Sequence, residues 1–232
     1  MVYIRYVTHY AHKNICKEIS RWIRNKRGYR DFDSITEMND HIVNQINKYV
    51  GENDILFHLG DWSFDGIDNI WNFRKRIKCK DIRLIMGNHD KHIINNKVLP
   101  NCMMIPGISH KISSIEEIDN DYKKLCYEVH AEELFTFCER YAEIEIDKIR
   151  LCLMHFPIED WNNRETDKCY MINGHVHGCE NIKDNRLDVG IDNAFKLFGE
   201  YRPFMFKEIV DIIEFRKLNI FKKIIKKIKY GI

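Results

Sequence analysis

Short apolar runs that stop abruptly at a small or polar residue are the feature that most limits what this chain can fold into. Such runs occupy residues 54–59, 81–86, 149–154 and 169–173, and are rich in Ile, Leu, Met and Phe. Each is followed at once by Gly or His, and the first two lead on through Gly to Asp or Asn. This pattern predicts buried strands with polar punctuation at their carboxyl ends.

Stretches with helical spacing lie between these runs. Apolar residues fall three or four apart over residues 35–49 and again over 67–77. An acidic, helix-prone insertion is expected at 109–134, and the alternating stretch 144–151 predicts a tight hairpin. Strand and helix alternate, so we expect an α/β fold. In open α/β sheets ligands collect outside the carboxyl ends of the strands, which is where the polar residues would meet.

The size of the chain fits one core. With 232 residues, 44% of them hydrophobic, it has enough apolar material for one enzyme-sized domain. We therefore expect a single domain over residues 1–214, with the insertion at 109–134, and a separate C-terminal segment at 215–232.

The chain carries no targeting signal that we recognise. It begins without a basic stretch and apolar h-region, and no apolar run approaches the roughly 20 residues that span a bilayer. We expect a soluble, cytoplasmic protein. Its eight cysteines form no C-x-x-C pair, so we interpret them as reduced thiols that pack as small hydrophobes.

The polar residues near the predicted strand ends have the chemistry of a divalent-metal site. Imidazoles, carboxylates and amide oxygens are the groups that hold ions able to activate water and clamp a phosphoryl group. Any one buried histidine is ordinarily a structural residue, but the combination is hard to obtain by accident. The candidate ligands are His9, Asp61, Asn88, His155, His175 and His177.

Four blocks of sequence carry a family resemblance. The blocks are Gly60-Asp61, then Gly87-Asn88-His89-Asp90, then His155-Phe156-Pro157, then Gly174-His175-Val176-His177-Gly178. In this order they resemble the signature of the calcineurin-like metallophosphoesterases. Thr8-His9-Tyr10-Ala11-His12 is similar to the first motif of the small bacterial and phage branch, and Trp161, Asp188-Val189-Gly190-Ile191-Asp192 and Tyr201-Arg202-Pro203 are further matches. The resemblance covers about residues 1–210 and implies two packed mixed β-sheets flanked by helices, in a four-layer αββα order.

The resemblance also implies residue roles. Asp61 would bridge two divalent ions of the Mn, Fe, Zn or Mg type. Asn88, His155 and His175 would complete one ion site, and His9 and His177 would serve the other. His89 would be the general acid that protonates the leaving-group oxygen, oriented by Asp90. His12 would meet a substrate phosphate at the rim.

One position departs from the family pattern. The family's first motif begins with an Asp two residues before the His, and here that position is Val7. Valine coordinates nothing, so the site of His9 and His177 is expected to be weak or empty. Three interpretations follow: the chain fills both sites at high metal concentration, works with one ion, or is inactive and retained for binding.

The C-terminal segment differs in charge from the rest. Residues 215–230 hold seven Lys and Arg and no acidic residue; of the chain's 37 basic residues 30 remain elsewhere, against 35 acidic ones. At helical spacing its apolar residues share one face, which is the pattern of a basic amphipathic helix. The helix either docks its apolar face on the domain or contacts an anionic surface, nucleic acid or lipid headgroups.

The function that these observations favour is metal-dependent hydrolysis of a phosphoester, with a lean toward phosphodiesters of nucleotides or nucleic acids because a basic tail concentrates them. The alternative is a degenerate member that binds a nucleotide or partner without turnover, marked by Val7. A third reading is a basic adaptor, in which residues 215–232 carry the function and the domain is a scaffold.

Overall fold

The computed structural model describes residues 1–232 except 6–7, 17–29, 95, 99–128, 179–184 and 231–232. Val7 and residues 109–128 of the expected insertion lie outside the described residues. Residues 129–134 form a short strand and a 3₁₀ turn, β5 (Val129–His130) and η5 (Ala131–Leu134). β5 pairs in antiparallel fashion with β4 (Lys97–Val98).

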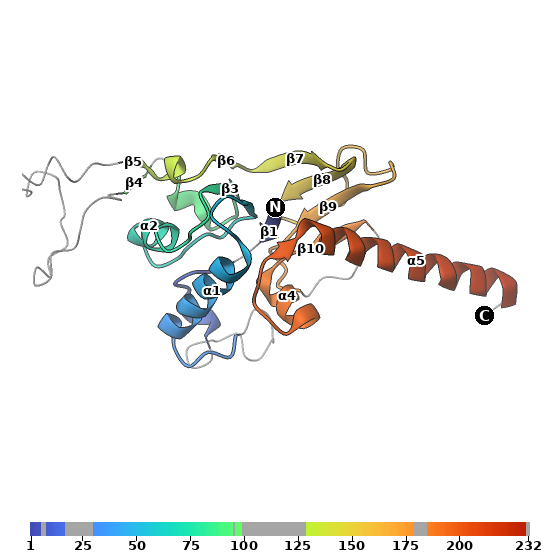
Figure 1. Ribbon diagram of the computed structural model, residues 1–232, viewed down its shortest axis with the longest axis horizontal. Coiled ribbons are helices and arrows are strands. Elements are labelled where there is room, and N and C mark those ends of the chain that lie inside the picture. Colours follow the sequence, from blue (N-terminus) through green and yellow to red (C-terminus); the bar gives the residue numbers. More distant parts are fainter. Residues whose placement is uncertain (6–7, 17–29, 95, 99–128, 179–184, 231–232) are drawn as a thin grey trace, which may run out of the picture.

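Two mixed sheets form the centre of the molecule (Figure 1). In the first, β1, β2, β3 and β6 are parallel and the edge strand β11 is antiparallel to β1. Its order is β11 (Phe204–Met205), β1 (Val2–Arg5), β2 (Ile55–His58), β3 (Asp81–Ile85), β6 (Phe137–Glu139).

In the second sheet, β10, β9 and β8 are parallel, and β7 is antiparallel to β8. Its order is β10 (Arg186–Asp188), β9 (Cys169–Asn173), β8 (Ile149–Met154), β7 (Tyr141–Ile146). The predicted strands at 54–59, 81–86, 149–154 and 169–173 are therefore confirmed as β2, β3, β8 and β9. The predicted hairpin is confirmed as β7 and β8, joined through Asp147 and Lys148, both with positive φ.

Two apolar cores hold the layers together. One lies between the sheets, where Phe57 and Ile85 of the first meet Leu153 and Ile172 of the second. The other lies between the first sheet and two helices that cover it, α1 (Ile35–Tyr49) and α2 (Asp68–Arg74).

The predicted helix at 35–49 is confirmed as α1. Ser34 caps it by accepting a hydrogen bond from the Glu37 backbone N–H at 3.1 Å. Met38, Ile42 and Ile46, spaced four apart, are buried against the sheet.

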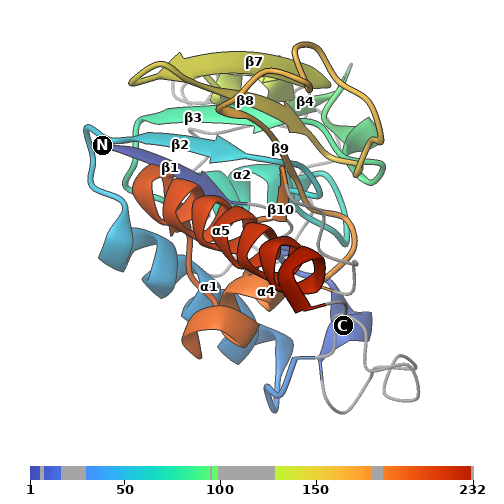
Figure 2. The same ribbon diagram turned by 90° about the vertical axis from the view of Figure 1, so that its right-hand side faces the viewer.

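The remaining helices frame the sheets. α4 (Ile191–Phe198) and α1 lie on the side of the molecule away from β7 (Figure 2). On the outer face of the second sheet, Ile158 and Trp161 pack against Cys152, Cys169 and Met171.

The C-terminal helix α5 runs from Phe206 to Tyr230 and crosses the expected boundary at 214 without a break. Ile209 and Ile213 anchor it in the core between the sheets. Phe215 and Leu218 are 66% and 50% exposed, and beyond them the helix extends away from the sheets (Figure 1). No helix in the described part of the chain is long and apolar enough to cross a membrane.

Candidate metal centre

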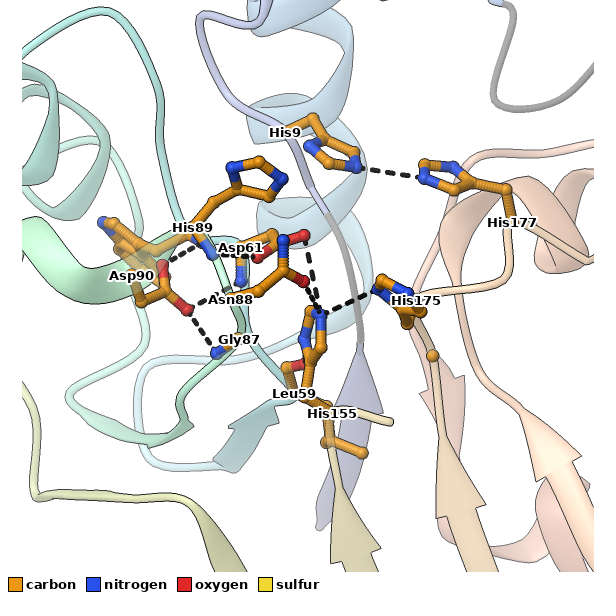
Figure 3. A network of polar contacts seen from close by, with 12 residues as sticks. His9, Leu59, Asp61, Gly87, Asn88, His89, Asp90, His155, His175 and His177 are labelled. Carbon is orange, nitrogen blue, oxygen red and sulfur yellow. Dashed lines mark hydrogen bonds and ion pairs between the residues drawn. The ribbon is translucent and has the colours of Figure 1, made fainter. Parts of the chain in front are cut away.

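The candidate ligands come from the carboxyl ends of both sets of parallel strands. Loops after β1, β2 and β3 carry His9, Asp61 and Asn88, and loops after β8 and β9 carry His155 and His175. Figure 3 shows these side chains converging at one edge of the two sheets. The sequence prediction that separate strands deliver polar groups to a common edge therefore agrees with the fold.

Left-handed backbone geometry recurs at these positions. His9, Asp61, His175 and His177 have φ of 48°, 51°, 66° and 50°. This backbone geometry is strained for residues that have a Cβ, and residues held in it cluster at functional sites. The turns re-aim these four side chains at the points where the chain leaves its strands.

Two glycines let His155 reach the loops of the first sheet. A Cβ on Gly60 would lie 2.5 Å from His155 Nδ1, and a Cβ on Gly87 would lie 2.4 Å from both Asp61 Oδ1 and His155 Cε1. Only a residue without a side chain fits at either place. The glycines of the Gly-Asp and Gly-Asn blocks thus serve packing across the two sheets.

The first group of candidate ligands centres on His155 Nε2. This nitrogen lies 2.8 Å from Asn88 Oδ1, 3.2 Å from His175 Nδ1 and 3.7 Å from Asp61 Oδ2. His155 Nδ1 lies 3.1 Å from the Leu59 carbonyl oxygen, an acceptor that places the ring proton on Nδ1. Burial lowers the pKa of His155 to about 3, so the ring is neutral. Its Nε2 therefore presents a lone pair to two oxygens that also present lone pairs.

Asp61 is a buried carboxyl without a countercharge in this group. Burial raises its pKa to about 7, the nearby charge of Asp90 adds to the rise, and a hydrogen bond from the His89 backbone N–H at 3.0 Å opposes it. A carboxylate, an amide oxygen and neutral imidazoles that all offer lone pairs to one region match the ligand chemistry of a divalent cation.

The second group pairs His9 with His177. Their Nε2 atoms are 3.2 Å apart and their rings are stacked with centroids 4.9 Å apart. Nitrogen ligands at ~2.1 Å from one ion lie roughly 3.0 to 3.4 Å apart, so this spacing fits two ligands of a single cation. Burial, and then the neighbouring His177, hold the pKa of His9 well below its usual range. The buried His9 Nδ1 has no hydrogen-bond partner within the described residues.

Two further residues, which the sequence did not single out as functional, support this second group. Asp192 Oδ2 lies 2.7 Å from His177 Nδ1, and Arg30 forms an ion pair with Asp192 at 2.9 Å. Burial opposes ionisation of Asp192, but Arg30 and His177 hold its pKa far below the usual range. Asp192 belongs to a block that matched the family, whereas no sequence signal marked Arg30.

Asp90 has a different set of contacts from the predicted one. We expected it to orient His89, but its carboxylate accepts hydrogen bonds from the backbone N–H groups of Asp61, Trp62 and Gly87 at 2.7, 2.8 and 2.7 Å. Burial raises its pKa, and the three N–H donors oppose the rise. Asp90 thus ties the loop after β2 to the loop after β3.

The rim of the site is aromatic. The Phe64 ring lies 4.1 Å from the His12 ring and 4.8 Å from the His89 ring, between centroids. His89 is exposed, and burial of part of its ring lowers its pKa while Asp90 acts in the opposite direction. Burial lowers the pKa of His12 to about 4. His12, which was predicted at the rim, and His89, which was predicted as the general acid, both lie beside His9, with ring centroids 5.0 and 6.4 Å from its ring.

Within the ranges that the structure describes, no three or more His, Cys, Asp or Glu side chains converge closely enough to form a metal-binding group. Three side chains approach His155 Nε2, and one of them does so through the amide oxygen of Asn88, a ligand type outside those four. The donor atoms are of the kinds that bind divalent ions.

Comparisons with known proteins bear on the fold alone. No protein-family model matches the chain, and no curated protein matches it. The chain is similar to the crystal structure of a protein of unknown function, AQ665 from Aquifex aeolicus, with 21% identity and a TM-score of 0.50 over 91% of this chain and 98% of that one. At this level of identity the likeness concerns the overall fold.

Proposed function

We propose that this chain is a metal-dependent phosphoesterase of the calcineurin-like type. The single observation that carries the proposal is the group around His155, in which Nε2, Asn88 Oδ1 and Asp61 Oδ2 all turn lone pairs toward each other. Groups of this kind repel one another unless a proton or a cation lies among them. The neutral ring of His155 supplies no proton there, and the proton that Asp61 holds below its pKa of about 7 is one that a bound cation would displace.

The fold supports the same proposal. Two face-to-face mixed sheets with helices over the first supply three of the four layers that the family has. The outer face of the second sheet is packed by Ile158 and Trp161 from the segment after β8. We propose that this is the calcineurin-like fold.

The residues divide the work as follows. Asp61 would hold both ions, Asn88, His155 and His175 would complete one site, and His9 and His177 would serve the other. Ions bound there supply a water of lowered pKa and neutralise charge on the phosphoryl group. Asp90 keeps the Asp61 and Gly87 loops in register through its three backbone hydrogen bonds.

Leaving-group protonation falls to His89, which is exposed at the rim. Its lowered pKa means that an anionic neighbour is needed to keep the ring protonated, and a phosphate bound beside it would serve. His12 would contact that phosphate from the other side of Phe64. The substrate class is a phosphodiester of a nucleotide or nucleic acid, because the basic residues of 215–230 attract polyanions.

The test is Mn²⁺-dependent hydrolysis of a generic aryl phosphodiester by the wild-type chain, His89→Ala and Val7→Asp. We expect wild-type turnover, a loss of 10²-fold or more in His89→Ala, and a modest gain in Val7→Asp, which restores the carboxylate of the family's first motif two residues before His9 in the sequence.

A second candidate function, binding of a nucleotide without turnover, is favoured by the valine at position 7. Binding without turnover becomes the favoured function if the wild-type chain does not hydrolyse the diester and Val7→Asp does. Hydrolysis that is the same with and without Mn²⁺ would reject the metallophosphoesterase proposal, and hydrolysis that survives His89→Ala would reject the role of His89 as the general acid.

A further inference from the structure

Arg30 is a charged side chain in the interior of the protein. It is 0% exposed, and its guanidinium donates to oxygen acceptors in two distant parts of the chain. Nε and Nη2 donate to Asp192 Oδ1 and Oδ2 at 2.9 and 3.2 Å, and Nη1 donates to the Thr8 carbonyl oxygen at 2.6 Å. A planar fork of fixed donors makes such contacts, and a lysine does not.

Asp192 connects Arg30 to His177. Asp192 Oδ2 lies 2.7 Å from His177 Nδ1. A carboxylate held by a guanidinium only accepts, so the ring proton of a neutral His177 lies on Nδ1 and the lone pair on Nε2. That Nε2 is the atom 3.2 Å from His9 Nε2 (Figure 3).

The Thr8 side reaches His9. Thr8 directly precedes His9. The hydrogen bond from Arg30 to the Thr8 carbonyl oxygen therefore fixes the orientation of the peptide group that joins Thr8 to His9. The left-handed φ of 48° at His9 then turns its ring toward His177. The Thr8 hydroxyl adds a second tie, since it donates to the Trp62 carbonyl at 2.8 Å.

A buried ion pair adds little net stability, because desolvation of both charges offsets their attraction. Stability alone therefore gives little reason for an arginine and an aspartate at these positions. Their geometry matters more, because one guanidinium contacts both the Asp192 carboxylate, which lies against His177, and the carbonyl of Thr8, the residue before His9.

We propose that Arg30 and Asp192 are positioning residues that fix the tautomer of His177 and its spacing to His9, and so preorganise this pair for a divalent cation although position 7 is valine. The cation part of this inference rests on the proposed function. The tautomer part does not, since it concerns the metal-free chain.

The first readout is the ¹⁵N spectrum of His177 in the metal-free protein, which separates a protonated Nδ1 from a protonated Nε2. Wild type should show the proton on Nδ1. Asp192→Asn should lose that single tautomer, because its amide has one oxygen to share between Arg30 and His177. The double variant Arg30→Met/Asp192→Leu removes both charges together, so that no unpaired charge is left in the interior.

The second readout is Mn²⁺ and Zn²⁺ binding by calorimetry. Wild type should bind two ions, and the double variant should bind one as before and the other at least 10-fold to 100-fold more weakly. The matched control is Glu208→Gln, which breaks another largely buried arginine pair, with Arg202 at 2.7 Å. It should leave both the His177 tautomer and the ion stoichiometry unchanged.

The possible results distinguish failure of the positioning role from failure of the proposed function. An unchanged His177 tautomer in Asp192→Asn and in the double variant overturns the inference, as does two-ion binding of unaltered affinity in the double variant. If wild type binds no divalent ion, the proposed function and the cation part of the inference fail together. A tautomer change that appears only in the Asp192 variants would still establish the positioning role in that case.

Discussion

Replacement of Asp90 by asparagine tests how the two loops of the candidate site are held together. Asp90 Oδ2 accepts from the Asp61 and Gly87 N–H groups, and Oδ1 accepts from the Trp62 N–H. Asparagine has one acceptor oxygen. With that oxygen in the Oδ2 position, its amide NH₂ would face the Trp62 N–H, so one hydrogen bond is lost and a buried donor meets another donor.

The cost follows from that count. A hydrogen bond to a charged group contributes ~1.5–3 kcal/mol, and an unsatisfied buried donor costs about 1–3 kcal/mol. Loss of the repulsion between Asp90 and Asp61, visible in the raised pKa of Asp61, offsets part of this. We expect Asp90→Asn to lower the free energy of unfolding by roughly 2–4 kcal/mol.

Urea denaturation of the metal-free protein at pH 7 measures the change, with Asp160→Asn as the control. Asp160 is exposed, so the same chemical change there should fall within about 0.5 kcal/mol. A loss at Asp90 no larger than that at Asp160 would refute the claim that this carboxylate ties the loops after β2 and β3.

Three further predictions concern the metal, acid stability and the tail. Mn²⁺ at a hundred times its Kd should raise the free energy of unfolding by about 2.7 kcal/mol, EDTA should reverse the gain, and His155→Ala should reduce it; no shift in a thermal melt would count against a metal site. Burial alone would raise the pKa of Glu208, but the hydrogen bonds from Arg202 and from the Met205 N–H, together with the charge of Arg202, lower it. The carboxylate therefore stabilises the fold above its ordinary pKa of 4.5, and that contribution is lost as pH falls through the folded-state pKa. Glu208→Gln should therefore cost about 1–2 kcal/mol at pH 7 and progressively less below pH 4.5 in denaturant titrations; a constant gap would contradict this. Truncation of the chain after residue 214 removes the seven basic residues of 215–230 and removes no acidic residue. The truncated chain should therefore elute from an immobilised polyanion at lower salt than the full chain. Elution of both at the same salt concentration would reject the anionic-surface hypothesis.

Periodicity was enough to predict several of the strands that position the site and the helix α1, but not β1, which precedes His9, or α4, which carries Asp192. The runs before Gly60, Gly87 and His155 are short and apolar, and they form β2, β3 and β8 at nearly the predicted bounds. α1 begins and ends where its apolar spacing does. Local pattern and tertiary burial agree in these segments, so sequence reasoning succeeds there.

Interactions that depend on tertiary contact were harder to predict. Nothing near Arg30 predicts that it meets Asp192, since 162 residues separate them. Asp90 follows His89 in the chain, which suggested an orienting role, yet its carboxylate turns to backbone N–H groups of two loops. α5 was expected from 215 but starts at Phe206, because Ile209 and Ile213 are core residues whose spacing continues into the basic segment.

The left-handed backbone at His9, Asp61, His175 and His177 also restricts how this site can change during evolution. Glycine, asparagine and aspartate tolerate that geometry, whereas β-branched residues are strained in it. If selection on the site relaxed, drift at these four positions would pass first through glycine or asparagine, and valine or isoleucine would be purged for its effect on folding. In homologues that have lost the site, a glycine or asparagine at these positions would therefore be the expected trace of a former ligand.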